Sequence, residues 1–193
     1  MVDIGAVIRI LREEVKDYRV PVVDFIKIQT KDPFKVLVST ILSARSKDKT
    51  TTEVSKRLFK VVNRPEDFEK LSEKQIRVLI YPIGFYKNKA KYLKMLPKAI
   101  EEAGGIPQTV DELVKLPGVG RKTANLVVVI AFEKPAVCAD IHVHRIMNRL
   151  GYVNTKTPFD TEMALRERLP KKYWIEFNSI FVAFGQHLCT PVS

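Results

Sequence analysis

The chain has 193 residues, 46% of them hydrophobic, which is enough to bury a core in one large globular unit or two small ones and argues against disorder. Its 33 Lys and Arg residues outnumber its 22 Asp and Glu residues, so the net charge of +11 at pH 7 favours a polyanionic partner such as nucleic acid. The longest apolar run, Leu126 to Phe132, is far too short to cross a bilayer, which argues against a membrane-spanning protein.

Apolar residues recur at helical spacing along almost the whole chain, so we expect a nearly all-helical, all-α fold. The longest alternating stretch that would suit a strand is Val22 to Ile28. Asp3 predicts the N-cap of a first helix that runs to about Tyr18.

The next helices have clear start signals. Asp32-Pro33 predicts one start, because Asp caps helices and Pro fits the first helical position. Asp48 predicts the cap of the helix that follows. Pro65 and Ser72 open two short helices, the second of which should end near Ile83-Gly84 with the glycine in the left-handed conformation.

A longer helix should run from Tyr86 towards Glu102, with a bend or break near Pro97, and stop at Gly104-Gly105. A short helix from Thr109 to Lys115 and a very apolar one from Arg121 to Phe132 should then flank a tight turn, and Pro135 ends that run. The last helices should open at Asp140, Pro158 and Lys171. No polar or glycine-rich linker interrupts this pattern, so we expect one unit, 1–193, made of two interlocked helical lobes.

The tight turn is suited to bind a phosphate. In Leu116-Pro117-Gly118-Val119-Gly120 the glycines permit close approach, and backbone N–H groups with the positive end of the next helix attract an anion. Arg121 and Lys122 add positive charge at the same place. The alternative is a glycine turn that only packs two helices, but the basic pair and the net charge favour a contact with the nucleic-acid backbone, which reads no sequence.

Two segments carry a specific resemblance. The stretch from Leu116 to Asn125, followed by Asp140-Ile141-His142-Val143-His144-Arg145, resembles the helix-hairpin-helix and the glycine/proline-rich loop with catalytic aspartate of the endonuclease III family of DNA glycosylases. The similarity extends from about Pro33 to Cys189. It implies two helical lobes with a DNA-binding cleft between them: a six-helix, barrel-like lobe at 22–132, with the hairpin at 109–132, and a terminal lobe formed by 1–21 and 133–193.

The resemblance implies that Lys122 and Asp140 are the catalytic residues. Base removal puts positive charge on the sugar carbon C1′, so it needs a nucleophile and an anion nearby. Lys122 lies in the first turn of a helix, where the dipole and burial favour an uncharged amine. Attack would give an imine that eliminates the 3′ phosphate, and relatives that only hydrolyse the base have another residue at this position. From the residues alone, Lys122 could also be a phosphate contact and Asp140 an N-cap.

Two further loops resemble those that the family uses to extrude the base. Arg45 stands where the family commonly has a glutamine that probes the vacated space, and its longer side chain can also insert and donate hydrogen bonds. Phe85 stands where an apolar residue wedges into the opposite strand, although an aromatic here could instead pack in the core. Lys87 and Lys89 are expected to contact phosphates.

Histidines and cysteines do not predict a metal site. His142 matches a family histidine and is expected to line the pocket or support the structure, whereas His142 and His144 do not share a helix face. Cys189 resembles the first of four cysteines that hold an iron-sulfur cluster in the family. The other three ligands are absent and Cys138 is an unlikely substitute, so we expect no cofactor in this chain and a [4Fe-4S] cluster only if the natural chain extends beyond Ser193.

We therefore expect a base excision repair glycosylase and AP lyase that acts as a monomer on double-stranded DNA containing an oxidised pyrimidine or an abasic site. One alternative is a glycosylase for thymine or uracil mispaired with guanine, and another is a non-catalytic DNA-binding module. The N-terminus has no signal-like stretch and two cysteines cannot form a disulfide framework, which indicates the cytoplasm or nucleoid of a prokaryote. The scarcity of Gln and Asn leans towards a thermophilic source without deciding it.

Overall fold

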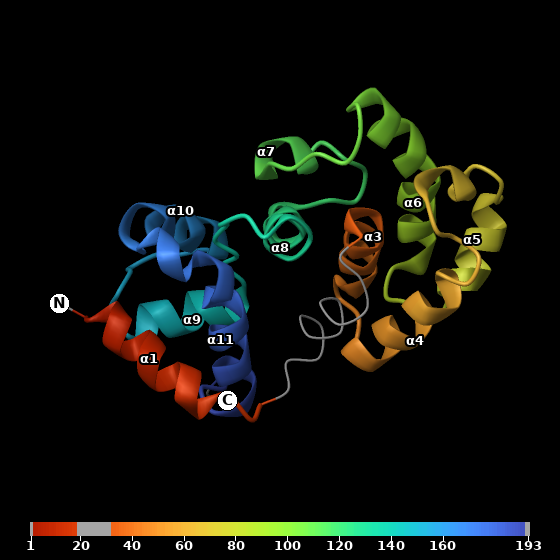
Figure 1. Ribbon diagram of the computed structural model, residues 1–193. Helices are drawn as coiled ribbons and strands as arrows, with labels where there is room; N and C mark the ends of the chain where they lie inside the picture. Colours follow the sequence, from red (N-terminus) through yellow and green to blue (C-terminus); the bar gives the residue numbers. More distant parts are fainter. Residues whose placement is uncertain (1, 19–31, 192–193) are drawn as a thin grey trace. The chain divides into compact units, whose positions relative to one another are not determined.

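The computed structural model describes residues 2–18 and 32–191, and within them all the regular structure is helical. Figure 1 shows the helices in chain order. Their bounds are α1 (Ile4–Glu14), α3 (Pro33–Ser43), α4 (Asp48–Leu58), α5 (Glu73–Ile80), α6 (Tyr86–Glu102), α7 (Val110–Leu113), α8 (Arg121–Phe132), α9 (Ile141–Arg149), α10 (Pro158–Arg168) and α11 (Trp174–His187), with short 3-10 helices η1 (Pro65–Phe68) and η2 (Lys171–Tyr173). The all-α prediction is confirmed, and the stretch Val22 to Ile28 lies outside the described residues.

The chain divides into two compact units, one formed by Met1–Val20 with Lys134–Ser193 and the other by Pro21–Glu133. We call these the terminal unit and the central unit. The lobe boundaries expected from the sequence differ from these by one residue at each end. Helices α3 to α8 belong to the central unit and α1 with α9 to α11 to the terminal unit, so each candidate site residue is described within its own unit.

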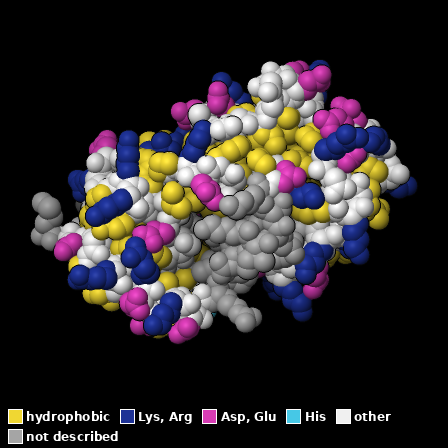
Figure 2. Space-filling view, in the orientation of Figure 1, with side chains coloured by type: hydrophobic (Ala, Val, Ile, Leu, Met, Phe, Trp, Pro, Cys, Tyr) yellow, Lys and Arg dark blue, Asp and Glu magenta, His cyan; other side chains and the backbone are white. Residues whose placement is uncertain are grey.

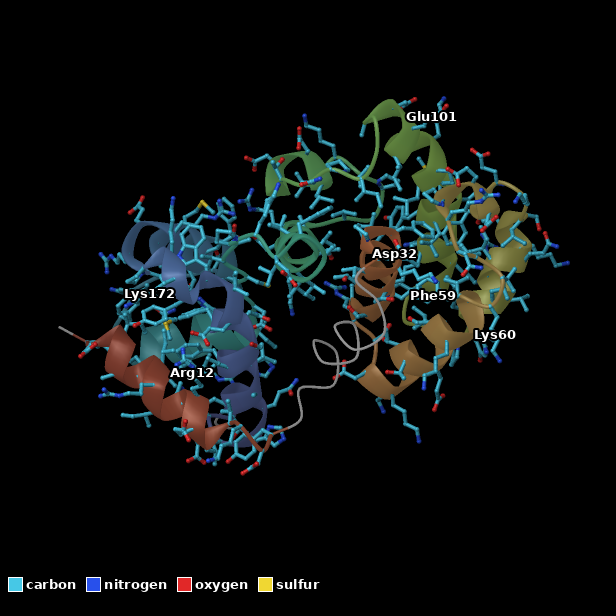
Figure 3. The ribbon with its side chains drawn as sticks, viewed as in Figure 1. Arg12, Asp32, Phe59, Lys60, Glu101 and Lys172 are labelled. Carbon is cyan, nitrogen blue, oxygen red and sulfur yellow. The ribbon has the colours of Figure 1, made fainter. Side chains whose placement is uncertain are left out.

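Several helices begin where the sequence places their start. The Asp32 carboxylate, labelled in Figure 3, accepts a 2.9 Å hydrogen bond from the N–H of Phe34, and Pro33 is the first residue of α3. At the start of α5, the Ser72 hydroxyl accepts from the N–H of Gln75 while the Gln75 side chain accepts from the N–H of Ser72. These caps satisfy N–H groups that have no acceptor within the helix.

Other predicted boundaries are wrong. Asp48 is the first residue of α4 rather than its cap, which is Lys47. Helix α1 ends at Glu14, and Tyr18 beyond it stacks on the His187 ring at 4.6 Å. Helix α6 continues through Pro97 without interruption.

The end of α5 also differs from the prediction. The helix stops at Ile80, and the following Tyr81-Pro82 bond is cis. Gly84 does not take the left-handed conformation expected of it, whereas Phe85 does, with φ of 58°. Gly84 is required for another reason: a Cβ there would lie 2.4 Å from the carbonyl oxygen of Arg45, so only glycine lets the two loops approach this closely.

Helix α3 is the core element of the central unit. Its residues from Val36 to Leu42 are all buried, and it packs against α4, α6 and α8. Helix α8, whose residues from Thr123 to Asn125 and Val127 to Ile130 are buried, is likewise apolar around most of its surface. A helix that is apolar on all sides is buried inside a domain. Because α3 and α8 are buried in this way, they hold the loops at their ends in fixed positions.

In the terminal unit, α11 packs against α1 and α9, and α10 packs against α9. A salt bridge of 2.5 Å joins Arg12 of α1, labelled in Figure 3, to Glu176 of α11. On the face shown in Figure 2, Lys and Arg side chains are distributed over both units with acidic side chains among them. None of the described helices has the length and apolar composition needed to cross a membrane.

Candidate functional site

The hairpin that joins α7 to α8 in the central unit has a backbone that demands glycine. Gly118 has φ of +77°, and a Cβ on it would lie 2.7 Å from Cδ2 of Tyr92 on α6. Both the dihedral angle and the contact therefore exclude a larger residue. The turn presses its backbone against an aromatic ring, and this contact fixes its position on the central unit.

The backbone N–H groups of the hairpin differ in whether they can donate to an external anion. The N–H of Val119, a buried residue, donates to the carbonyl of Leu116 at 3.2 Å, so this amide closes the turn and does not point outward as expected. Gly118 and Gly120 are exposed, and in the described part of the chain their N–H groups have no acceptor. The backbone ladder of α8 begins with Ala124 donating to Gly120, which has no side chain to cap the helix. Two exposed amides at the positive end of a helix are suited to bind an anion.

Arg121, the first residue of α8, adds a guanidinium to this anion site. One of its terminal nitrogens lies 3.5 Å from the carboxylate of Asp111, whose side chain is 87% exposed. Water screens a pair in which one partner is this exposed, so the ion pair itself contributes little to stability.

Lys122 is the second residue of α8 and is exposed, so the burial that was expected to favour an uncharged amine is not observed. A carboxylate of the same unit, that of Asp48, is influenced by it: partial burial raises the Asp48 pKa above its ordinary value, and the positive charge of Lys122 lowers it. Asp48 was read from the sequence only as a helix cap, so this pairing was missed. Asp48 lies three residues after Arg45, at the start of α4, and nothing in the local sequence shows that it lies near Lys122.

Asp140 lies in the terminal unit and caps α9. It is 6% exposed, and its Oδ1 accepts hydrogen bonds from the N–H groups of His142 and Val143 at 2.9 and 3.0 Å. The capping alternative left open by the sequence is therefore real. The two hydrogen bonds hold the Asp140 carboxylate in one position at the start of α9, and a carboxylate held in this way can stabilise a cation.

His142 is held by its neighbours. Its Nδ1 lies 3.2 Å from a guanidinium nitrogen of Arg145, and a Cβ on Gly185 of α11 would come within 2.7 Å of the same atom. Arg145 in turn donates to the carbonyls of Gly185 and Cys189. These contacts support a structural role for His142, and the pocket-lining role stays a prediction.

Arg45 and Phe85 lie at the surface of the central unit, next to one another. Both have a left-handed backbone, with φ of 54° and 58°, and the Arg45 guanidinium lies 5.5 Å from the centre of the Phe85 ring. Phe85 is 58% exposed, so the structure does not use it for core packing. Lys87, two residues further along, is exposed and available for a phosphate.

Lys89 does not fit the expected role of a phosphate contact. It is 6% exposed, and its Nζ donates to the carbonyls of Leu42 and Ala44 at 2.8 and 2.6 Å and reaches the Ser46 hydroxyl at 3.4 Å. Burial lowers the Lys89 pKa to about 8. The sequence showed an alternation of lysines on a helix start, but only the packing of α6 against α3 turns this one inward.

The described residues contain no group of three or more His, Cys, Asp or Glu side chains arranged to hold a metal ion. Cys138 is buried, and the sulfur of Cys189 accepts a hydrogen bond from Arg149 at 3.2 Å. Two cysteines in the sequence are too few for the four thiolates of an iron-sulfur cluster. We therefore derive no step through such a cluster.

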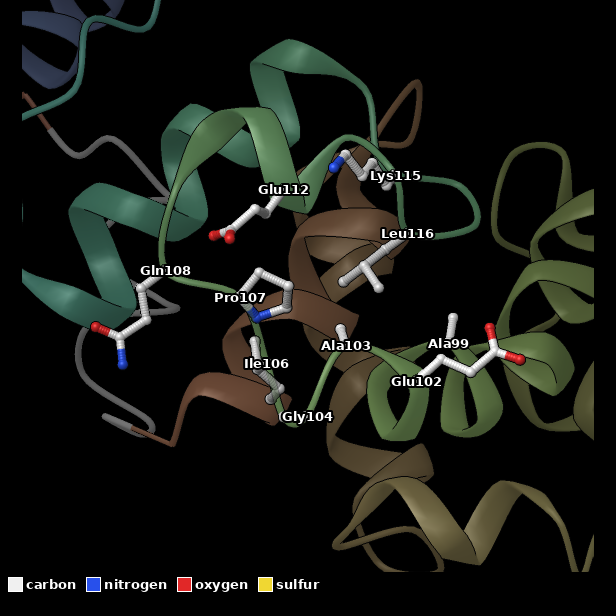
Figure 4. A pocket seen from close by; sticks show the side chains of 11 residues that line it. Ala99, Glu102, Ala103, Gly104, Ile106, Pro107, Gln108, Glu112, Lys115 and Leu116 are labelled. Atoms are coloured by element: carbon white, nitrogen blue, oxygen red, sulfur yellow. The ribbon is translucent and has the colours of Figure 1, made fainter.

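The central unit also contains a pocket of about 550 Å³ between the end of α6 and α7, with Pro107, Leu116 and Ala103 around it (Figure 4). Its charged lining residues are Glu102, Glu112 and Lys115. The pocket includes none of the residues predicted to bind DNA or to act on it. A mixed, partly acidic lining is poorly suited to a polyanion.

Comparison with known proteins gives consistent matches. Residues 38–171 match the family model described as HhH-GPD superfamily base excision DNA repair protein. The chain is 45% identical over 162 residues to endonuclease III of Thermotoga maritima, covering 83% of this chain and 76% of that protein. It is 40% identical over 174 residues to endonuclease III homolog 1, chloroplastic, of Arabidopsis thaliana, where the match spans 84% of this chain but only 46% of the plant protein.

Among solved structures, the chain is similar to a trapped endonuclease III-DNA covalent intermediate, with a TM-score of 0.87 and 32% sequence identity. That match covers all of this chain and 91% of the other. The long identity match and the similarity of the whole backbone agree with each other, and both include the hairpin and the start of α9.

Proposed function

The chain belongs to the endonuclease III family within the HhH-GPD superfamily of base excision DNA repair proteins, and we propose that it is a bifunctional glycosylase and AP lyase that removes oxidised pyrimidines from duplex DNA. One observation carries the bifunctional assignment. A lysine, Lys122, follows directly on a glycine hairpin with exposed amides, at the positive end of α8. A nucleophile is thereby placed beside an anchor for the sugar-phosphate backbone.

The hairpin supplies the anchor. A phosphate next to the damaged nucleotide binds the amides of Gly118 and Gly120 and the guanidinium of Arg121, with Lys87 contacting a second phosphate. Because these contacts reach backbone atoms only, they bind any sequence and weaken steeply with salt. Specificity for damage then has to arise where the base is extruded.

Lys122 carries out the covalent step. Its uncharged amine forms a bond to C1′ of the extruded nucleotide while the bond from C1′ to the base breaks, and the base leaves with a proton. The sugar ring opens to an imine with Lys122. Loss of a proton from C2′ then expels the 3′ phosphate, which cuts the strand, and water releases the amine from the imine. Asp140 stabilises the positive charge that develops on the sugar and accepts or returns protons.

Arg45 and Phe85 act on the base stack. Arg45 enters the space that the extruded base leaves and donates hydrogen bonds to the opposite base, and Phe85 wedges between bases of the opposite strand. His142 lies two residues after Asp140, the N-cap of α9, and we expect it to line the base pocket. We infer a monomer that works in the cytoplasm or nucleoid, since a single chain supplies the hairpin, Lys122 and Asp140.

Borohydride reduction tests the lyase. Incubation with a duplex that carries one oxidised pyrimidine, in the presence of borohydride, should trap a covalent protein-DNA complex in wild type and none in Lys122→Ala. Lys98→Met is the matched control, because its side chain is 80% exposed on α6 and, among the described residues, forms an ion pair only with Glu102. Equal trapping in Lys122→Ala would remove Lys122 from the mechanism.

The substrate class needs a separate comparison. A panel of duplexes with an oxidised pyrimidine, an abasic site, or thymine or uracil opposite guanine should show the highest single-turnover rate on the oxidised pyrimidine. Faster cleavage of the mispaired duplexes would instead favour a mismatch glycosylase. Binding of every duplex without cleavage of any would leave a DNA-binding module.

A further inference from the structure

The two loops that carry Arg45 and Phe85 are tied together below the surface. Lys89, in the first turn of α6, reaches across to the loop at the end of α3 and donates to the carbonyls of Leu42 and Ala44. The residue between these carbonyls and Ser46 is Arg45 itself. A buried ammonium that hydrogen-bonds to several carbonyls is held firmly, because any departure leaves a charge without compensation.

A second tie joins the same loops. The Ser46 hydroxyl accepts a 3.0 Å hydrogen bond from the N–H of Gly84, the residue before Phe85. The closeness of Gly84 to the Arg45 carbonyl leaves no room for the loops to slide past one another. The left-handed backbone at both Arg45 and Phe85, costly for residues with side chains, is thus imposed by contacts between the loops.

We propose that Lys89 is a positioning residue: its buried ammonium locks the 42–46 loop onto α6 so that Arg45 and Phe85 enter the base stack as one preformed unit. We call the hydrogen bonds from Lys89 to the carbonyls of Leu42 and Ala44 the Lys89 clamp. The effect of the clamp on repair rests on the proposed function, whereas the clamp itself does not. The cation-π contact between the exposed side chains of Arg45 and Phe85 is too weak to fix them alone. The clamp beneath supplies the rigidity that insertion requires, since a misplacement of about 1 Å can cost a hundredfold in rate.

The same helix provides a matched control. Lys94, five residues after Lys89, is only half-buried but makes the same type of contact, donating to the carbonyls of Phe68, Glu69 and Leu71 at 3.3, 2.9 and 2.8 Å. That loop follows η1 and carries no residue placed in the DNA-binding machinery. Lys89→Met and Lys94→Met therefore remove the same kind of interaction from two different loops.

Amide hydrogen exchange tests the clamp without any substrate. Lys89→Met should raise exchange in the peptide spanning 42–47 and leave 68–72 unchanged, whereas Lys94→Met should do the reverse. Lys89→Gln, whose amide still donates to a carbonyl, serves if the methionine variant fails to fold. Unchanged exchange at 42–47 in a folded Lys89 variant would overturn the clamp, whatever the activity.

A double-mutant cycle tests the positioning role. On an oxidised-pyrimidine duplex, kcat/KM should fall about tenfold or more in Lys89→Met, consistent with misplacement of an inserting group, and less than about twofold in Lys94→Met, which acts at a distant site. In an Arg45→Ala background, Lys89→Met should cost little further, because it acts through Arg45. Full additivity of the two losses would reduce Lys89 to a general stabiliser. A wild type that cuts none of the duplexes would instead refute the proposed function, with exchange still deciding the clamp.

Discussion

The backbone of Gly118 lies against the ring of Tyr92, so close that a Cβ would be 2.7 Å from Cδ2. The hairpin that is proposed to grip DNA is therefore seated on α6, the helix that also positions Phe85 and Lys89. The DNA anchor and the base-extruding loops share one support, so the distance between them is set by a single helix.

Gly118→Ala should destabilise the protein and weaken DNA binding together. An alanine at φ of +77° costs about 1–2 kcal/mol, and the clash with Tyr92 adds to it. Urea unfolding of Gly118→Ala, Tyr92→Ala and the double variant separates the two causes, because in the Tyr92→Ala background the change at Gly118 costs only the backbone strain. Gly120→Ala is the stability control, since its φ is −91° and a Cβ there meets nothing within 4 Å. Equal stability of the two alanine variants would contradict the strain at Gly118.

Substitutions of Asp140 should separate capping from chemistry. Asn caps helices about as well as Asp, whereas Ala loses about 1 kcal/mol. Asp140→Asn should therefore keep the thermal midpoint close to wild type while greatly reducing base excision, because the negative charge is gone. Asp140→Ala should lose both. The measurement is a thermal melt beside single-turnover excision, and normal excision by a folded Asp140→Asn would restrict Asp140 to its cap.

Lys89 predicts a rise of stability in alkali. Its pKa is lowered from 10.5 to about 8 in the folded state, so between these pH values the unfolded chain binds a proton that the folded protein has released. The free energy of unfolding must therefore increase with pH across this window. Urea unfolding at pH 7.5 and pH 10 should show wild type gaining stability relative to Lys89→Met, a comparison in which the other titrating groups cancel. If the free energy of unfolding of wild type, relative to that of Lys89→Met, does not rise between these pH values, Lys89 keeps its proton in the folded protein.

Asp111→Asn should tighten DNA binding. The exposed carboxylate of Asp111 pairs with Arg121 at 3.5 Å and repels phosphate at the hairpin, so its removal should raise affinity about two- to fivefold at low salt, an effect that salt screens. Fluorescence anisotropy with an undamaged duplex at two salt concentrations measures it. An affinity that is lower in the variant would mean that Asp111 orients Arg121 productively.

The sequence alone was sufficient for features that depend on neighbouring residues. Asp32-Pro33, the Ser72 capping box and the turn at 116–120 each combine start, cap or turn residues within a few positions, so their local energetics decide the outcome whatever the rest of the chain does. The helical periodicity is local in the same sense, and it fixed the all-α class.

Tertiary structure decided the features that depend on distant residues. It turned Lys89 inward to the 42–46 loop and set Asp48 where the charge of Lys122 reaches it. It also brought Gly84 close to the Arg45 carbonyl and gave Phe85, rather than Gly84, the left-handed backbone. The local sequence around a lysine near a helix start is the same whether its side chain points into water or donates hydrogen bonds to buried carbonyls. Only the packing of α3 against α6 and α8, which are distant from α3 in the sequence, decides between the two orientations.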